Sequence, residues 1–189
     1  QNLPLGMPAR IVCYLASHIW LESVHTPIAG EIPINKEDHG FYSGKTAIVT
    51  GAGFAALKDG SAGSIGYGIA TAFAKEGANL VITGRNEKKL DAAKEKLESA
   101  YGIDVLTAQA DINASADNKA VAQGVVDEAM AKFGRIDFLV NNAQASASGV
   151  TLADHTPEQF DLAIYSGLYA AFYYMQACYP HLKETKGSV

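Results

Sequence analysis

The chain has 189 residues, of which 48% are hydrophobic and 19% are charged, and its formal net charge is −5. This composition is typical of a globular domain with its own core and excludes an intrinsically disordered chain. The negative charge argues against nucleic acid or an anionic membrane as the main partner. No apolar run reaches the ~20 residues that a membrane-spanning helix needs.

The first residues lack a basic stretch followed by an apolar one, so we expect no secretory signal and a cytoplasmic location. Cys13 and Cys178 lie far apart in unrelated apolar patterns, which favours two buried thiols over a disulfide. The scattered histidines have no metal-ligand spacing, so no metal site is expected.

Three segments are expected along the chain. In residues 1–34 the apolar pattern predicts a short helix and then a strand at 31–34, which its proline confines to a sheet edge. Residues 35–43 are charged and rich in turn formers, which is typical of a linker. From residue 44 to residue 189 strands and helices alternate, as in a single α/β domain.

Within residues 44–189, strands are expected at 46–50, 79–83, 105–110 and 136–140. Helices are expected at about 65–76, after residue 86 up to Gly102, before Gly134, and from about 157 to 179. The second carries Leu90, Ala93, Leu97 and Ala100 on one face. This alternation predicts a doubly wound parallel sheet with helices on both faces, of the Rossmann-like type.

A glycine-rich turn joins the first strand to the first helix. Thr-Gly-Ala-Gly at 50–53 follows the strand, and Ser-Ile-Gly at 64–66 begins the helix. Glycines let a phosphate approach the backbone, and a helix N-terminus offers it unpaired N–H groups. The alternative is an ordinary glycine-rich surface turn. Residues 54–63 either reach over an adenosine or form a surface insertion, and we favour the insertion.

Residues after the next strands indicate which nucleotide would bind. Gly84 stands where an acidic residue would bind a ribose 2′-hydroxyl, and Arg85 follows it, which favours NADP(H) over NAD(H). Alternatively, Arg85 is a solvated residue at a helix start. Asp111 suits an adenine amino group, a helix N-cap, or both. Asn141 and Asn142 could tie neighbouring strand ends together.

Residues 44–189 resemble the first two thirds of a short-chain dehydrogenase/reductase, through Thr-Gly and Ser-Ile-Gly, Asp111, Asn-Asn-Ala at 141–143 and Tyr-Pro-His-Leu at 179–182. The resemblance implies a nicotinamide cofactor, hydride transfer to or from a small carbonyl or alcohol, and a homodimer or homotetramer. The expected cofactor contacts are Gly51, Ser64, Ile65, Gly66, Arg85, Asp111, Ile112, Asn142 and Ala143.

The sequence departs from the family pattern at three positions. Ser64 replaces the middle glycine of the family's turn, and a serine at this position resembles the pattern of the enoyl-reductase branch. Gln144 replaces the glycine of Asn-Asn-Ala-Gly. Gly167 replaces an asparagine that supports the proton relay in the family.

No catalytic residue is assigned in the chain. The family's serine and its Tyr-x-x-x-Lys pair belong to elements that would follow residue 189. Tyr179 and Lys183 have the spacing, but we reject them because Pro180 interrupts the helix and the motif falls on the wrong helix. Ser188 precedes the family's serine strand. The isolated chain is therefore not expected to catalyse hydride transfer.

Residues 1–34 loosely resemble the family's C-terminal end. A segment similar to the C-terminal end of the family would then precede the cofactor-binding part. This order is compatible with a permuted chain, a junction of tandem domains, or a sequence whose middle is not supplied. Two alternatives to an oxidoreductase remain, a cofactor-binding module without chemistry and an assembly role. The assembly role is suggested by Tyr165, Tyr169 and Tyr173, which recur every four residues on the last helix.

Overall fold

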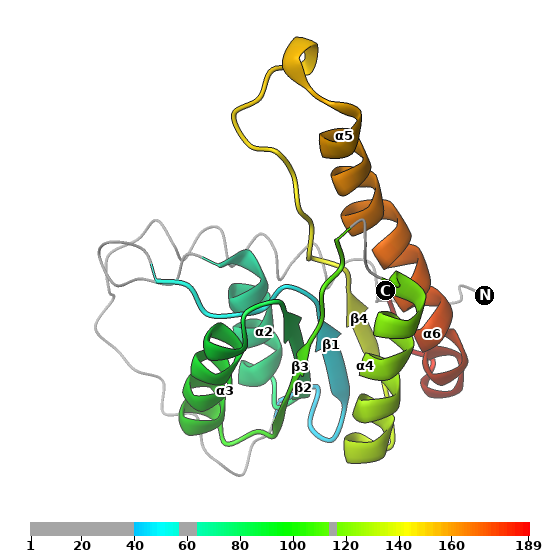
Figure 1. Ribbon diagram of the computed structural model, residues 1–189. Helices are drawn as coiled ribbons and strands as arrows, with labels where there is room; N and C mark the ends of the chain where they lie inside the picture. Colours follow the sequence, from blue (N-terminus) through cyan, green and yellow to red (C-terminus); the bar gives the residue numbers. More distant parts are fainter. Residues whose placement is uncertain (1–39, 57–63, 114–116) are drawn as a thin grey trace, which may run out of the picture.

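The computed structural model describes residues 40–56, 64–113 and 117–189, so the expected helix and edge strand in residues 1–34 lie outside the described residues. Its centre is a four-stranded sheet in the order β3-β2-β1-β4 (Figure 1). The strands are β1 (Thr46–Val49), β2 (Asn79–Gly84), β3 (Val105–Gln109) and β4 (Phe138–Val140). All three pairings are parallel, so the expected α/β architecture is confirmed.

Helices cover both faces of the sheet. In Figure 1, α2 (Ile65–Lys75) and α3 (Glu87–Tyr101) lie on one side, and α4 (Asn118–Phe133) and α6 (Ala170–Thr185) lie on the other. Alternate residues of β1 supply the two cores, because successive side chains of a strand point to opposite faces. Ala47 and Val49 pack with α2 and α3, while Ile48 packs with α4 and α6.

Local signals in the sequence fix the helix ends. The side chain of Asn86 accepts a hydrogen bond from the Lys89 N–H at 3.0 Å and begins α3. Gly102 ends it with a φ of 65°, in the left-handed region that favours glycine. The buried stripe of α3 was wrongly expected to include Ala100, which is exposed. Tyr101 continues the stripe instead, because it packs against the core.

The last helix differs from the expectation. It begins as α5 (Pro157–Ala163), widens into one π-helical stretch, η2 (Ile164–Tyr169), and continues as α6 to Thr185. The expected end near residue 179 and a break at Pro180 are therefore wrong. Pro180 is exposed inside α6, and buried Leu182 holds the following turn against the core, so the helix tolerates one missing N–H bond.

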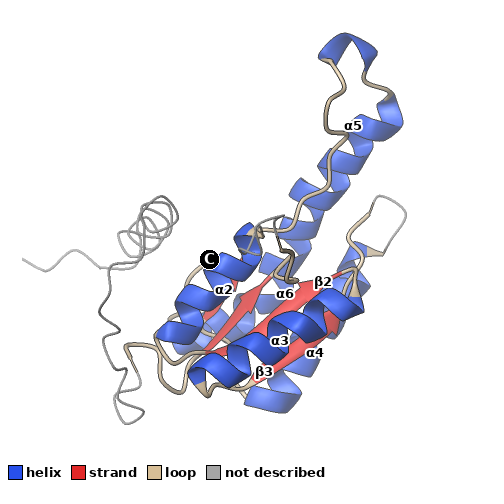
Figure 2. Cartoon of the chain, turned by 90° about the vertical axis from the view of Figure 1, so that its left-hand side faces the viewer, coloured by secondary structure: helices blue, strands red, loops and turns tan. Residues whose placement is uncertain are grey.

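The loop after β4, the short 3₁₀ turn η1 (Leu152–Asp154) and α5 form an arm that stands out from the sheet (Figures 1 and 2). It carries exposed apolar side chains, among them Leu152 and Phe160. The arm connects the carboxyl end of β4 to the helix that covers the sheet, so it lies beside the edge where the strand ends gather.

The two ends of the described region also pack on the domain. Tyr42, in the described part of the expected linker, contacts the rings of Phe73 and Phe138 at 5.6 and 4.8 Å between centroids. Near the other end, the Leu139 N–H donates to the Ser188 carbonyl oxygen at 3.0 Å, and Ser188 pairs in parallel with Phe138. Strand pairing beyond β4 therefore begins at Ser188.

Cys178 is buried and free, as expected, whereas Cys13 lies outside the described residues. None of the helices in the described ranges is both long enough and apolar enough to cross a membrane. Among the same residues, no three acidic, histidine or cysteine side chains are grouped so that they could hold a metal ion.

Candidate cofactor cleft

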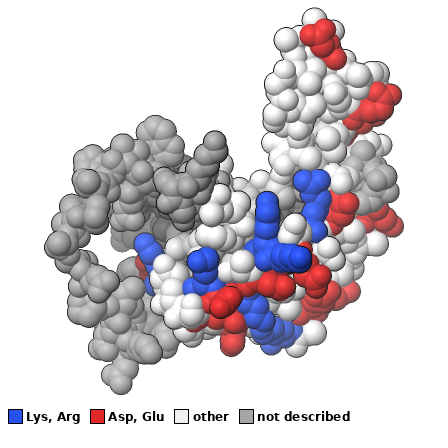
Figure 3. Space-filling view, turned by 60° about the vertical axis from the view of Figure 1, so that its left-hand side comes forward, with Lys and Arg blue, Asp and Glu red and all other residues white. Residues whose placement is uncertain are grey.

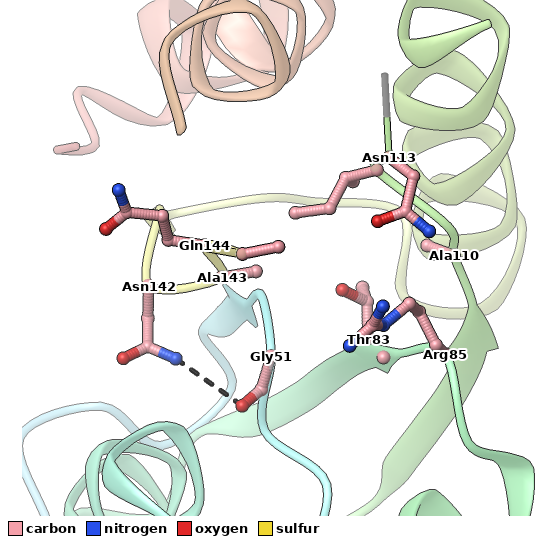
Figure 4. A pocket seen from close by; sticks show the side chains of 11 residues that line it. Gly51, Thr83, Arg85, Ala110, Asn113, Asn142, Ala143 and Gln144 are labelled. Carbon is pink, nitrogen blue, oxygen red and sulfur yellow. Dashed lines mark hydrogen bonds between the residues drawn. The ribbon is translucent and has the colours of Figure 1, made fainter. Parts of the chain in front are cut away.

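A cleft of about 200 Å³ lies at the carboxyl ends of the parallel strands (Figure 4). Ligands bind at this edge in open α/β sheets, because loops from neighbouring strands diverge there. Residues from the ends of all four strands line it: Gly51, Thr83, Gly84, Arg85, Ala110, Ile112, Asn113, Asn142, Ala143, Gln144 and Ala145.

Thr50 and Asn142 clamp the ends of β1 and β4 together beneath the cleft. The Thr50 hydroxyl donates to the Val140 carbonyl at 3.2 Å and accepts from the N–H groups of Asn142 and Ala143 at 2.9 and 3.0 Å. The Asn142 side-chain amide donates to the carbonyl oxygens of Thr50 at 2.9 Å and Gly51 at 3.4 Å. The prediction that an asparagine amide joins neighbouring strand ends is confirmed for Asn142.

Two glycines of the turn are required by the backbone. Gly51 has a φ of 70°, which a residue with a side chain adopts only with strain. A Cβ at Gly66 would lie 2.6 Å from the Asn142 Nδ2 and still closer to the Gly51 carbonyl oxygen. The first turn of α2 can therefore lie against the strand end only because residue 66 lacks a side chain.

The start of α2 is built as the sequence indicates, although its residues do not line the cleft itself. Ser64 is the N-cap, and its hydroxyl accepts from the Tyr67 N–H at 3.4 Å. Ile65 is 77% exposed. Gly66 is buried behind Gly51. The helix N-terminus thus lies next to the glycine turn, with a side chain already satisfying one of its N–H groups.

Arg85 follows β2 and lines the cleft beside Gly84. Its carbonyl oxygen accepts from the Gln109 amide at 3.0 Å, which fixes the backbone between the ends of β2 and β3. Its guanidinium makes no ion pair or hydrogen bond with any residue in the described ranges. Where β2 ends, the cleft therefore has a cation that is unpaired among the described residues.

After β3, the structure separates three residues that are adjacent in the sequence. Ile112 and Asn113 line the cleft, whereas Asp111 does not. The Asp111 carboxylate accepts from the Asn113 N–H at 3.1 Å. Its expected alternative role as a helix N-cap is wrong, because Asp117 caps α4 by accepting from the Ala120 N–H at 3.1 Å. The intervening residues place Asp111 too far upstream.

Several residues that line the cleft were not among the expected cofactor contacts: Thr83, Gly84, Ala110, Asn113, Gln144 and Ala145. Thr83 immediately precedes the expected Gly84 position, so its place at a strand end was a usable signal. Asn113 and Ala145 carry no such signal, because irregular loops bring them to the cleft.

The start of the loop at residues 54–63 leaves the cleft. The Phe54 N–H donates to the Lys89 carbonyl at 2.9 Å, and the Phe54 ring packs edge-on against Tyr67 at 5.1 Å. These contacts hold Phe54 against α2 and α3. Residues 57–63 lie outside the described residues, so the choice between a surface insertion and an adenosine contact stays a prediction.

The π-helical stretch η2 is joined to the loop that follows β4. The Ser166 hydroxyl, which is fully buried, accepts from the Ala145 N–H at 2.9 Å and lies within hydrogen-bond distance of the carbonyl oxygens of Ala145 and Leu162. The Asn118 amide on α4 donates to the Tyr165 carbonyl at 3.0 Å. These bonds hold the arm at a fixed position beside the cleft.

Charge on the face that carries α3 is mixed. Figure 3 shows basic and acidic side chains side by side there, as the interleaved Lys and Glu of α3 predict. Lys94 and Glu98 are one such pair, at 3.9 Å on successive turns. Such a face offers no surface of a single charge sign to a polyanion. The positive charge of Arg85 therefore acts locally, within the cleft.

Comparison with known proteins agrees with this geometry. A family model described as Enoyl-(Acyl carrier protein) reductase matches residues 60–189. The chain is 58% identical over 150 residues to the 12alpha-hydroxysteroid dehydrogenase of Clostridium sp., an alignment that covers 79% of this chain and 55% of that protein. The chain belongs to the short-chain dehydrogenase/reductase family.

Solved structures of this family have the same fold. The L-sorbose reductase of Gluconobacter frateurii, complexed with NADPH and L-sorbose, aligns with a TM-score of 0.65 and 29% identity over 78% of this chain and 50% of that one. An NAD+-bound xylitol dehydrogenase aligns with a TM-score of 0.63 over 78% and 52%, and at 24% identity it supports the fold alone. The chain spans about half the length of the curated relatives it matches.

Proposed function

We propose that this short-chain dehydrogenase/reductase chain forms the NADP(H) cleft of an oxidoreductase that transfers hydride to or from a carbonyl or alcohol. The observation that carries the cofactor preference is the Arg85 guanidinium in the cleft, which pairs with no described residue and lies next to a glycine where an acidic residue would disfavour a phosphate. A guanidinium binds a phosphate through two parallel hydrogen bonds.

The cleft and the helix start beside it together suit a dinucleotide. Gly51, Ser64, Ile65 and Gly66 form a glycine turn beside a helix N-terminus, which suits a pyrophosphate. Ile112, Asn142 and Ala143 line the same cleft as Arg85, and the Asp111 carboxylate accepts from the N–H of Asn113, another lining residue. The nicotinamide ring supplies the hydride chemistry when bound, and the residues of this chain bind and orient it.

The affinities of NADPH and NADH, measured by fluorescence titration of the purified chain, test this proposal. NADPH should bind at least tenfold more tightly, because a charge-assisted bond to the 2′-phosphate contributes about 1.5–3 kcal/mol. Equal affinities, or tighter binding of NADH, would contradict the cofactor preference. Failure of both to bind would contradict the cleft.

For the substrate, the relative at 58% identity points to a hydroxyl group on a steroid. We infer oxidation of a secondary alcohol on a large apolar ring system, with the ketone as product. The test is a protein that contains this chain together with the family's catalytic elements, assayed with NADP+ and 12α-hydroxysteroids, with open-chain sugar alcohols as the contrasting substrates. A preference for the polyols would overturn the steroid assignment.

Assembly is a second candidate role. Exposed apolar side chains follow one face of η2 and α6, at Tyr165, Leu168, Tyr169, Phe172, Met175 and Tyr179. Tyr173, which was expected in this stripe, is instead partly buried against the core. Such a stripe is typical of a helix that packs on a partner subunit. It is compatible with the oxidoreductase, and with a binding module that lacks catalysis of its own. We therefore propose a homodimer or larger homo-oligomer.

A further inference from the structure

Gln144 and Gly167 are neighbours across the cleft's edge, although they are far apart in the sequence. A Cβ at Gly167 would lie 3.6 Å from both the Cγ and the Nε2 of Gln144, which is ordinary van der Waals contact. A methyl group fits there. A longer side chain at residue 167 would need the volume that the Gln144 side chain occupies.

The contact is built into the surrounding structure. Gly167 lies in η2, and the bonds of Ser166 to the backbone of Ala145 fix η2 directly against the residue that follows Gln144. The Asn118 bond to the Tyr165 carbonyl holds the same stretch from α4. The pair therefore cannot separate without breaking hydrogen bonds on both sides.

The Gln144 carboxamide is free to bind something else. The side chain lines the cleft and is exposed, and it makes no hydrogen bond with any residue in the described part of the chain. Figure 4 shows Gln144 and Arg85 on opposite sides of the pocket. If Arg85 binds the phosphate on the adenosine, Gln144 faces the other half of the dinucleotide.

We propose that the Gln144 carboxamide is a binding contact to the nicotinamide half of the cofactor, in a position that a long side chain at residue 167 would occupy. The contact is one or two hydrogen bonds between the amide and the hydroxyl or carboxamide groups of that half. The inference rests on the proposed function, since it requires the cleft to take a nicotinamide nucleotide.

The test compares NADPH with adenosine 2′,5′-bisphosphate, which contains the phosphorylated adenosine but no nicotinamide. Gln144→Met keeps the volume of the side chain and removes its amide. We expect its dissociation constant for NADPH to rise about three- to tenfold, the loss of one neutral hydrogen bond, while that for the bisphosphate changes less than about twofold. Gln176→Met makes the same chemical change on the exposed face of α6, outside the cleft, and as the matched control it should leave both constants unchanged.

A second pair of variants tests the shared volume. Gly167→Asn should weaken NADPH binding by crowding Gln144, and Gln144→Gly in the same chain should restore it. Equal thermal unfolding midpoints of the variants exclude a folding defect.

Unchanged NADPH affinity in Gln144→Met would overturn the inference and leave the proposed function standing. An equal loss for both ligands would also overturn it, because the residue would then act on the whole cleft. If the unaltered chain bound neither ligand, the proposed function would fail as well.

Discussion

Arg85 is the side chain on which the cofactor preference depends. Arg85→Ala should weaken NADPH binding by about 1.5–3 kcal/mol and leave NADH binding nearly unchanged, because only NADPH carries a 2′-phosphate for the guanidinium. Isothermal titration of both cofactors measures this. Lys88→Ala removes the same charge from an exposed site on α3 that does not line the cleft, and it should change neither affinity. Equal losses for both cofactors in Arg85→Ala would contradict the assignment.

A second residue-scale prediction concerns Asp137, which is 3% exposed. Its carboxylate accepts from the Thr46 N–H at 2.9 Å and from two guanidinium nitrogens of Arg135 at 2.8 and 2.6 Å. This pairing raises the pKa of Arg135. Asp137→Asn should lower the free energy of unfolding by about 1.5–3 kcal/mol, because an amide NH₂ would face the guanidinium donors.

Urea unfolding measures the effect, and Asp127→Asn on the exposed face of α4 is the control. That control should cost less than about 0.5 kcal/mol. A loss of the same size in both variants would show that the buried pairing is not responsible.

At this scale the sequence identified some site residues and not others, for physical reasons. Gly51 and Gly66 were predictable, because a tight turn against a helix N-terminus requires glycine there. Arg85 was predictable from its place after a strand. The contact of Gln144 with Gly167 was not, because it depends on how a distant helix packs against the loop. Spacing along the chain contains no such information.

At the scale of elements, η2 depends on hydrogen bonds from outside the helix. In η2 the Tyr165 carbonyl accepts from the Ala170 N–H, five residues later in the chain, and also from the Asn118 side-chain amide on α4. The Ser166 hydroxyl binds the backbone of both Ala145 and Leu162. We attribute the wide turn to these partners.

Ser166→Ala should lower the free energy of unfolding by about 1–3 kcal/mol, because it leaves the partly buried Ala145 N–H without its acceptor. Hydrogen exchange should also become faster at residue 145 and along the arm. Thr151→Ala, which removes an exposed hydroxyl elsewhere in the arm, is the matched control. Unchanged exchange at residue 145 would show that the serine does not hold the loop.

The strands and most helices followed from apolar periodicity and glycine stops, since both are local signals. The π-helical stretch and the continuation through Pro180 were missed. A π-helical turn contains only one residue more than an α-helical turn, so it shifts the spacing of the apolar residues too little to be recognised in the sequence. The helix continues past the proline because Leu182, packed against the core, stabilises the following turn.

At the scale of the whole molecule, burial couples stability to alkaline pH. Burial raises the pKa of the Cys178 thiol from 9.0 to about 12, and it raises that of the Tyr174 phenol to about 12. At a pH below the pKa that each group has in the unfolded chain, the stability contributed by its burial is fully present. As the pH rises towards about 12, the group ionises in the unfolded chain but not in the folded one, so this stability is lost. The free energy of unfolding should therefore fall above about pH 9, by at most about 1.4 kcal/mol per pH unit for each group.

Urea titrations at a series of pH values measure the slope. Cys178→Ala should reduce it between pH 9 and pH 10, where the thiol of the unfolded chain ionises. An unchanged slope in that variant would show that other groups cause the alkaline loss.

Assembly is also a property of the whole molecule. We expect light scattering at micromolar concentration to show a dimer or larger species, because the apolar stripe on η2 and α6 is otherwise left in water. Phe172→Glu should shift the population towards monomer by placing a charge in the contact. Ser99→Glu, on the exposed side of α3, should not. A clean monomer of the unaltered chain would contradict the proposed interface.

The clamp between Thr50 and Asn142 has a consequence for the lifetime of the protein. The same hydrogen bonds that join β1 to β4 also shape the floor of the cleft, so opening that floor breaks the centre of the sheet. A dinucleotide bound there would oppose unfolding by about 2.7 kcal/mol at a concentration one hundred times its dissociation constant. Proteases cleave the opened chain, so degradation would slow about a hundredfold when the nucleotide pool is full. The supply of cofactor would then set how long each molecule persists, before any reaction takes place.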